Sequence, residues 1–317
     1  MALRTKSDMS AAPPSFAVNL VDVTKRFGTQ VAVNNLSLQV PTGSIYGFIG
    51  PNGSGKTTTI RMILHIFLAD SGTVEVLGRQ GTRSANDDIG YLPEERGLYK
   101  KMTVRRMLLY YAALKGVSEK AAGPEVDRWL ERMDLTPWGK KNVEALSKGM
   151  AQKVQFISAV LSKPKLLILD EPFSGLDPVN LEVLRSAILD VRKQGTTVIF
   201  STHNMTTAEE MCDYIFMIYR GNKVLDGTLA SIRATYGEDT IRLRVQGGRA
   251  ALQGVEGVEV TRDFGQHLEI RNPGDPQALL QRIAAKARVE LFEVTTPSLH
   301  DIFVRIARPE TKEEANA

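Results

Sequence analysis

The 317-residue sequence lacks the marks of small secreted proteins and of membrane-spanning proteins. Its single cysteine, Cys212, cannot form a disulfide within the chain. The longest unbroken apolar run, Met107 to Leu114, is far shorter than the roughly 18 residues that suggest a transmembrane helix. The first 15 residues carry charged side chains where a secretory signal has an apolar core. These absences favour a folded protein of a reducing, cytoplasmic compartment.

The sequence also lacks a large excess of positive or negative charge. The chain has 40 Lys and Arg against 36 Asp and Glu, a net charge of +4, which tolerates an anionic membrane surface or a nucleic acid but requires neither. Hydrophobic residues at 43% and charged residues at 24% are near globular averages, which excludes a disordered or fibrous chain. The length is enough for about two domains, each with its own core.

The hydrophobic pattern indicates an α/β domain over residues 16–236. Short β-rich runs alternate there with helical patterns, as in layered α/β folds. The nearly continuous apolar runs Ile45 to Ile49 and Leu166 to Leu169 are typical of central strands covered on both faces. Between these two strands, apolar residues at helical spacing predict a helical insert over about residues 102–161.

The pattern changes after residue 236. Alternating strand-like runs, then a helical pattern, another strand and a last helix predict a small α+β domain over residues 237–308. Residues 1–15 are expected to form a flexible arm, and residues 309–317 a disordered tail. We find no internal repeats.

A phosphate-binding loop follows the first of the two buried strands. Residues 50–57 read GPNGSGKT, which fits G-x-x-x-x-G-K-[ST] between a strand and a helical pattern. The glycines let successive N–H groups face an anion, and the helix adds its positive end. Lys56 is expected to reach the β- and γ-phosphates, and Thr57 to hold Mg²⁺. The predicted ATP-contacting residues of this segment are Gly50, Pro51, Asn52, Gly53, Ser54, Gly55, Lys56, Thr57 and Thr58.

Two carboxylates follow the second buried strand. Asp170 is placed to anchor Mg²⁺ indirectly, from outside its immediate ligands, and Glu171, next in the chain, to polarise an attacking water as a general base. The next predicted strand ends at His203, so the parallel arrangement brings this side chain to the same edge of the sheet. We expect His203 to contact the γ-phosphate and to hold the water and Glu171 in place.

Two further motifs complete the pattern. Residues 146–150 read LSKGM ahead of the Asp170 strand, and residues 174–177 read SGLD after it. With the phosphate loop, Glu171 and His203, they resemble the ATP-binding cassette (ABC) family over about residues 16–236. The resemblance implies a P-loop NTPase fold with a helical subdomain. It also implies that two such domains pack head to tail, so that each ATP lies between one domain's phosphate loop and the other's signature.

The resemblance also implies roles for individual residues. The residues expected to face the partner's ATP are Ser147, Lys148, Gly149 and Met150. Asp177 would bridge the two sites. Phe27 matches the aromatic residue that stacks on adenine, although it could be an edge-strand core residue. Ala32 would pack near the ribose, or else be an ordinary strand residue.

Two positions depart from the family pattern. Met150 replaces the glutamine that usually ends the signature, and Glu94 stands where the family has a glutamine that contacts Mg²⁺. A carboxylate keeps the oxygen ligand that Mg²⁺ prefers but adds a negative charge beside ATP. The LPEERGLY segment at 92–99 and the PSLHDIF ending at 297–303 are similar to a subgroup of exporter ATPases that includes sodium-export-type proteins.

The resemblance therefore implies an ATP-hydrolysing transporter subunit, an exporter rather than an importer, with ATP and Mg²⁺ as cofactors. A separate transmembrane permease subunit and a second ATP-binding subunit, identical or paralogous, are the expected partners, with no nucleic acid. The chain would then lie at the inner face of the cell membrane. The basic residues at 100, 101, 105 and 106 are either a solvated surface or part of the face toward the permease.

Alternatives from other classes explain less of the sequence. A soluble ABC-type ATPase that acts on DNA carries a long coiled coil between phosphate loop and signature, and only about 90 residues separate Lys56 from Ser147. Its ribosome-directed relatives carry two cassettes, and this chain has one phosphate loop. A P-loop kinase leaves residues 146–150 and His203 without a role. Specificity for the cargo would lie in the membrane subunit.

Overall fold

The computed structural model describes residues 15–80, 87–95, 97–236, 240–272 and 274–307. The arm expected at the start of the chain, up to residue 14, and the expected tail lie outside the described residues. The chain divides into two compact units, Met1–Asp226 and Gly227–Ala317. The second unit thus begins ahead of helix α7 (Leu229–Tyr236), whereas the sequence pattern changes after that helix.

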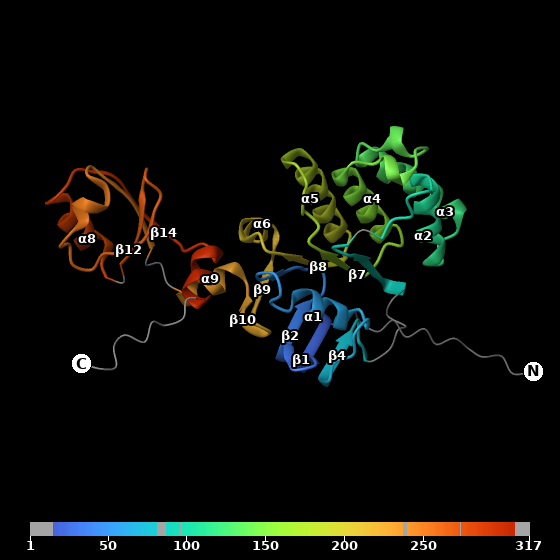
Figure 1. The fold of residues 1–317 in the computed structure, drawn as a ribbon, viewed down its shortest axis with the longest axis horizontal. Helices are drawn as coiled ribbons and strands as arrows, with labels where there is room; N and C mark the ends of the chain where they lie inside the picture. Colours follow the sequence, from blue (N-terminus) through green and yellow to red (C-terminus); the bar gives the residue numbers. More distant parts are fainter. Residues whose placement is uncertain (1–14, 81–86, 96, 237–239, 273, 308–317) are drawn as a thin grey trace, which may run out of the picture. The chain divides into compact units, whose positions relative to one another are not determined.

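A six-stranded sheet forms the centre of the first unit, in the order β10-β9-β3-β8-β7-β6 (Figure 1). Its strands are β3 (Ile45–Ile49), β6 (Ile89–Leu92), β7 (Leu166–Asp170), β8 (Thr197–Thr202), β9 (Tyr214–Tyr219) and β10 (Asn222–Gly227). Strands β6, β7, β8, β3 and β9 pair in parallel. Every residue of β3, β7 and β8 is buried, which explains their apolar runs. Parallel pairing brings the carboxyl ends of β3, β7 and β8 to one edge.

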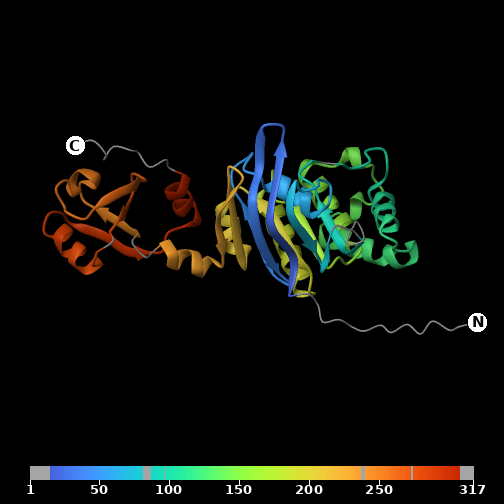
Figure 2. The ribbon, with the colours of Figure 1, turned by 90° about the horizontal axis from the view of Figure 1, so that it is seen from below.

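A four-stranded antiparallel sheet, in the order β2-β1-β4-β5, covers one face of this core. Its strands are β1 (Phe16–Phe27), β2 (Gln30–Pro41), β4 (Ser71–Val76) and β5 (Arg79–Gln80). Helix α1 (Lys56–Ile63) lies between the two sheets (Figure 1), and the blue strands of the antiparallel sheet face the viewer in Figure 2. Its Ile60 and Ile63 belong to one buried cluster with Leu20 of β1 and Phe48 of β3. The helix that follows the phosphate loop is thereby fixed on both sides.

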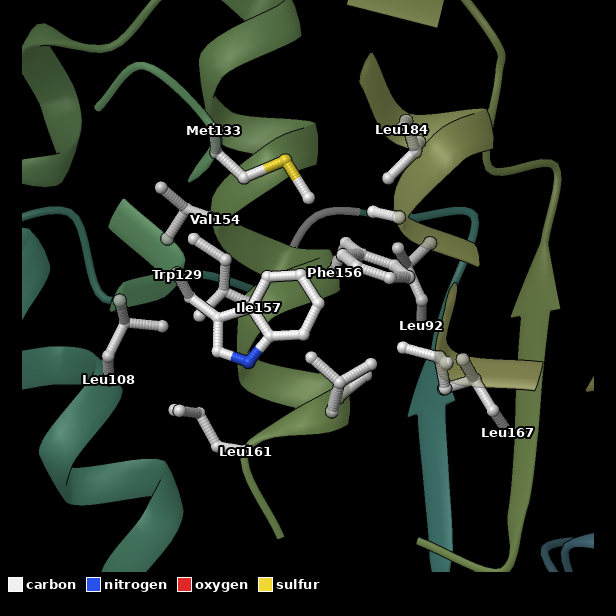
Figure 3. Packing of buried hydrophobic residues seen from close by; sticks show 14 of the residues in the cluster. Leu92, Leu108, Trp129, Met133, Val154, Phe156, Ile157, Leu161, Leu167 and Leu184 are labelled. Carbon is white, nitrogen blue, oxygen red and sulfur yellow. The ribbon is translucent and has the colours of Figure 1, made fainter. Parts of the chain in front are cut away.

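The opposite face of the central sheet is covered by helices. They are α2 (Val104–Leu114), α3 (Glu119–Arg132), α4 (Lys148–Val160), α5 (Pro178–Lys193) and α6 (Met205–Met211). Trp129 of α3 and Phe156 of α4 meet edge to face, with ring centres 5.7 Å apart, within the cluster that also holds Leu92 and Leu167 of the sheet (Figure 3). In the part of the chain that the structure describes, no helix combines the length and apolar character needed to cross a membrane.

This packing predicts the cost of truncating a core ring. Phe156 is fully buried, so Phe156→Ala removes its contacts and leaves a cavity. We expect the free energy of unfolding of the first unit to fall by about 3–5 kcal/mol, measured by urea denaturation. Leu68→Ala, at a largely exposed position, is the control and is expected to change it by no more than about 0.5 kcal/mol. Equal effects of the two variants would contradict the assigned core.

The second unit holds an antiparallel sheet in the order β12-β13-β11-β14. Its remaining elements are β11 (Thr240–Val245), the short 3-10 helix η4 (Gly248–Leu252), β12 (Glu259–Asp263), β13 (Leu268–Arg271), α8 (Pro276–Ala284), β14 (Val289–Thr295) and α9 (Leu299–Ala307). Leu243 and Ile270 of the sheet share a buried cluster with Leu279 and Ile283 of α8. The expected fold class, an α/β unit with a helical subdomain followed by a small α+β unit, is confirmed.

Candidate functional site

The loop between β3 and α1 adopts a backbone that only glycine accommodates at two positions. Gly55 has φ of 115°, and a Cβ atom built on it would lie 2.6 Å from the carbonyl oxygen of Ala32. Gly50 is equally restricted, because its Cβ would lie 2.3 Å from the carbonyl oxygen of Ile218. The loop therefore rests directly on the backbone of β2 and β9, which fixes its course.

A pair of glycine variants tests this geometry. Gly55→Ala forces a Cβ against backbone that cannot move aside, so we expect a loss of about 1–3 kcal/mol in unfolding free energy, together with weaker ATP binding. Gly53→Ala meets open space and bears only the strain of its φ of 75°, about 1 kcal/mol. Denaturant unfolding of both variants checks the order, and a larger loss for Gly53→Ala would contradict the described loop.

Lys56 is the first residue of α1, and its side chain folds back over the loop. The amine donates hydrogen bonds to the carbonyl oxygens of Gly50, at 2.7 Å, and Pro51, at 3.0 Å. Burial lowers the pKa of this amine, and the carboxylates of Glu171, Asp170 and Glu94 oppose that shift. Lys56 is thus a cation held at the centre of the loop with acidic groups around it.

A groove of about 470 Å³ opens over this loop. It is lined by Phe27, Gln30, Ala32, Asn52, Gly53, Ser54, Gly55, Lys56, Thr57, Thr58, Glu94 and Glu171. The structure thereby gathers most of the expected ATP-contacting residues in one place, together with Gln30, for which the sequence held no signal. Phe27 is 44% exposed and packs its ring edge to face on Phe67, with centres 5.4 Å apart. A partly exposed ring that lines a groove can stack on a flat ligand.

The two carboxylates lie at the carboxyl end of β7. Asp170 is 1% exposed, and its Oδ1 accepts a hydrogen bond from the Ser201 hydroxyl. Its Oδ2 is buried with no hydrogen-bond partner among the described residues. Glu171, also buried, has a left-handed backbone with φ of 49°, and its N–H donates to the Ser201 hydroxyl oxygen at 3.0 Å. An unpartnered buried carboxylate oxygen is a position that a cation would satisfy.

His203 follows β8 directly, at the same edge of the sheet. Its Nδ1 lies 3.0 Å from Oε1 of Glu171, a hydrogen-bonding distance. The imidazole is largely exposed while the carboxylate is buried, so a buried and fixed group holds the exposed side chain of His203 in one orientation. The carboxylate–imidazole pair predicted from strand order is therefore present. Within the described structure, the lining of the groove includes Glu171 but neither His203 nor Asp170.

The signature segment lies at the start of α4. Ser147 is exposed and caps this helix, with its hydroxyl oxygen accepting the N–H of Met150 at 3.3 Å. Lys148, next in the chain, is exposed, and Gly149 and Met150 are half-buried. None of these four residues is in the described lining of the groove.

Asp177 caps α5 at the end of the SGLD segment. Its carboxylate accepts the N–H of Asn180 at 2.9 Å, and hydrogen bonds from Asn180 hold the pKa of this carboxyl below its usual value. Asp177 is exposed and likewise absent from the described lining of the groove. The signature and the start of α5 lie side by side, because a Cβ atom built on Gly149 would lie 3.4 Å from the side chain of Leu176 and 3.7 Å from that of Asn180.

Two polar side chains near the carboxylates were not found from the sequence. Ser201 lies beside Asp170 in the sheet, and Gln152 of α4 donates from Nε2 to the carbonyl oxygen of Pro172 at 3.0 Å. Both are buried. A polar residue at the end of an apolar strand, as Ser201 is, offers a weak signal, whereas Gln152 has none because its partner is distant in sequence.

A glycine-rich phosphate loop on a parallel sheet, with a buried lysine beside paired carboxylates, defines a P-loop ATPase. Comparison with known proteins narrows the class. A family model described as ABC transporter matches residues 33–174, and one described as ATP-binding protein DrrA1-3-like, C-terminal domain, matches residues 227–307.

Individual relatives agree with these matches. The chain is 44% identical to an uncharacterized ABC transporter ATP-binding protein, YhaQ, of Bacillus subtilis, over 89% of this chain and 95% of the relative. It is 32% identical to the Nod factor export ATP-binding protein I of a Rhizobium species, over 92% of this chain and 96% of the relative. A solved structure of an ATP binding subunit of an ABC transporter superposes with a TM-score of 0.66 at 30% identity, covering 70% of this chain and 93% of that one.

The chain belongs to the family of ABC transporter ATP-binding proteins. It binds ATP and is an ATPase coupled to transport, as the sequence predicts. A soluble ATPase directed at nucleic acid or the ribosome is not favoured by these relatives. Some of them are export proteins by name.

Proposed function

We propose that this chain is the ATP-hydrolysing subunit of an exporter and that its site is completed by a second ATP-binding subunit. The observation that supports it most is the buried Glu171 carboxylate, which lines the phosphate-loop groove and holds His203 at 3.0 Å. Glu171 acts as general base on the attacking water, and His203 contacts the γ-phosphate and orients both. Lys56 binds the β- and γ-phosphates as a point charge.

The residues present fit a magnesium ion. Thr57 and Glu94 line the groove with oxygen ligands, and Asp170 offers its unpartnered Oδ2. We assign the holding of Mg²⁺ to these three residues. When bound, the ion neutralises charge on the phosphate oxygens. The groove end at Phe27 and Ala32 takes the adenine and ribose.

The signature supports a composite site. Ser147 and Asp177 are exposed and do not line this chain's own groove in the described structure, so they are available to a second subunit. The N-terminus of α4 presents its positive end there, which suits the γ-phosphate of an ATP held by the partner. ATP would then close the dimer and hydrolysis would reopen it.

A second groove supports the permease contact. It has about 390 Å³ and is lined mainly by apolar side chains, among them Ile66, Leu98 and Leu114. Ile66 and Leu114 are more than half exposed, an arrangement that marks an interaction surface. Of the basic cluster at 100, 101, 105 and 106, Arg105 and Arg106 line a separate groove, and Arg105 is paired there with Asp127 at 2.9 Å. We assign this groove to contact with the membrane subunit, which would hold the chain at the inner face of the membrane. We also propose that the transporter moves its cargo outward.

The first experiment measures Mg²⁺-dependent ATP hydrolysis by the purified chain against its concentration. A specific rate that rises with concentration, and disappears in Glu171→Gln, is expected for a site shared by two copies. A specific rate independent of concentration, from a protein that sediments as a monomer, would contradict the composite site.

Mixing two inactive variants gives a sharper test. Lys56→Ala damages the phosphate loop, and Ser147→Arg damages the signature. In a mixed dimer, one site combines an intact loop with an intact signature, so the mixture should recover up to about a quarter of the original activity. If both halves of a site belonged to one chain, mixing would restore none.

We further propose residues 237–308 as an accessory domain that assists dimerisation or regulates it, attached to an ATP-binding domain at 16–236. Truncation after Tyr236 is expected to weaken ATP-dependent dimerisation in sedimentation experiments. Unchanged dimerisation and unchanged ATPase activity would contradict this role.

A further inference from the structure

One hydroxyl group bonds both acidic residues of the site, the carboxylate of Asp170 and the backbone of Glu171. Ser201 pairs with Asp170 in the parallel register of β7 and β8, and it is completely buried. Its hydroxyl donates to Oδ1 of Asp170 and accepts the backbone N–H of Glu171 at 3.0 Å. A serine hydroxyl has a single proton to donate, so its donation to Asp170 leaves the oxygen lone pairs for Glu171.

One of these bonds fixes the orientation of the Asp170 carboxylate, and the other fixes the backbone of Glu171; ATP hydrolysis depends on both. With Oδ1 of Asp170 bonded to Ser201, this carboxylate keeps one orientation, and its Oδ2 has no hydrogen-bond partner in the described part of the chain. The bond to the N–H of Glu171 stabilises a left-handed backbone, which is strained for a residue with a side chain. That backbone turn determines where the Glu171 carboxylate points, and the carboxylate in turn meets His203.

We propose that Ser201 is a positioning residue of the ATPase, which aligns the Mg²⁺-binding carboxylate of Asp170 and the base Glu171 as one unit. This inference rests on the proposed roles of those two residues. Ser201 acts through them and does not itself touch the nucleotide. Its role resembles that of the outer partners of metal ligands, whose loss commonly costs about 10- to 100-fold in metal affinity or activity.

The same strand offers a matched control. Thr197, four residues earlier and also completely buried, accepts the N–H of Gly43 at 2.9 Å through its hydroxyl oxygen. Thr197→Val therefore removes one buried hydroxyl that holds a backbone N–H, as Ser201→Ala does. It does so at the amino end of β8, away from the carboxylates.

The experiment compares Ser201→Ala and Thr197→Val by steady-state ATP hydrolysis over a range of Mg²⁺ concentrations and by nucleotide binding with and without Mg²⁺. For Ser201→Ala we expect kcat to fall about tenfold or more, and the Mg²⁺ concentration for half-maximal effect to rise by a similar factor. Binding of ATP without Mg²⁺ should not change, because Lys56 and its loop are untouched. Thr197→Val should lower thermal stability with kcat and Mg²⁺ dependence unchanged, and Ser201→Thr should recover much of the lost kcat.

Two results would overturn the inference: a folded Ser201→Ala protein with the original kcat and Mg²⁺ dependence, or an equal kinetic loss in Thr197→Val. If Ser201→Ala does not fold, Ser201→Cys keeps nearly the same volume with a much weaker hydrogen-bonding group and takes its place, under the same criteria. Glu171→Gln is measured in parallel. Full turnover in that variant would contradict the proposed function itself, whereas its inactivity beside a fully active Ser201→Ala would contradict only the role of Ser201.

Discussion

Glu171→Gln is expected to lower turnover about 10²- to 10⁴-fold and to leave ATP binding intact. The amide has the shape of the carboxylate and can still hydrogen-bond His203, 3.0 Å away in the native protein, so the geometry is kept while the basic oxygen is lost. Single-turnover phosphate release measures the chemical step, and titration with a fluorescent nucleotide measures affinity.

Glu182→Gln is the matched control for this variant. Glu182 is on α5 and pairs with Arg185 on the surface, so the same chemical change there should leave turnover unchanged. Turnover by Glu171→Gln at the original rate would remove Glu171 from the role of base. A loss of ATP affinity without a loss of single-turnover rate would assign it to binding.

Lys56→Ala is expected to weaken ATP binding about 10- to 100-fold. Hydrogen bonds to charged groups contribute about 1.5–3 kcal/mol, and this amine is the positive charge at the centre of the loop. Calorimetric titration with ATP measures the loss. The variant also leaves the carbonyl oxygens of Gly50 and Pro51 without this donor, so thermal unfolding must be recorded alongside.

Lys115→Ala is the control that separates a loss of ATP affinity from a loss of stability. Lys115 is a half-buried lysine that donates to the carbonyl oxygen of Ile89 at 3.1 Å, and burial lowers its pKa as it does for Lys56. Its removal should disturb stability in a comparable way with no change in ATP affinity. Unchanged ATP affinity in Lys56→Ala would contradict the assignment of the phosphate loop.

Sequence reasoning reached most of this site because its parts depend on local chain geometry. A glycine-rich loop between a strand and a helix has few backbone courses, and Gly50 and Gly55 show why glycine is required. The placement of Glu171 and His203 at one edge of the sheet was predicted because parallel strands end at the same edge, and the pairing of β7 with β8 then brings the two side chains together. The resemblance added Phe27, Ala32 and Glu94, and the structure places all three in one groove.

Side-chain partners distant in the sequence could not be inferred in this way. The bond from Ser201 to Asp170 depends on the exact register of two strands, and the pairing of Arg105 with Asp127 depends on how α2 packs on α3. A basic run appears as one cluster in the sequence, although one of its charges is neutralised in the fold. The left-handed backbone of Glu171 was also not foreseen, because a residue with a side chain rarely adopts it.

The contact between Gln152 and Pro172 bears on whether two ATP sites hydrolyse together or one after the other. Gln152 is on the helix that begins at the signature, little more than one turn from Ser147, and Pro172 follows the base directly. In the dimer that we propose, the start of α4 would contact the nucleotide of the other subunit, while Gln152 holds the turn beside Glu171 of its own subunit. A short stretch of helix is stiff, so displacement of α4 either breaks the 3.0 Å bond or moves the turn. In the dimer that we propose, this one hydrogen bond would couple the base of each subunit to the nucleotide held by the other, so that the two sites hydrolyse ATP together.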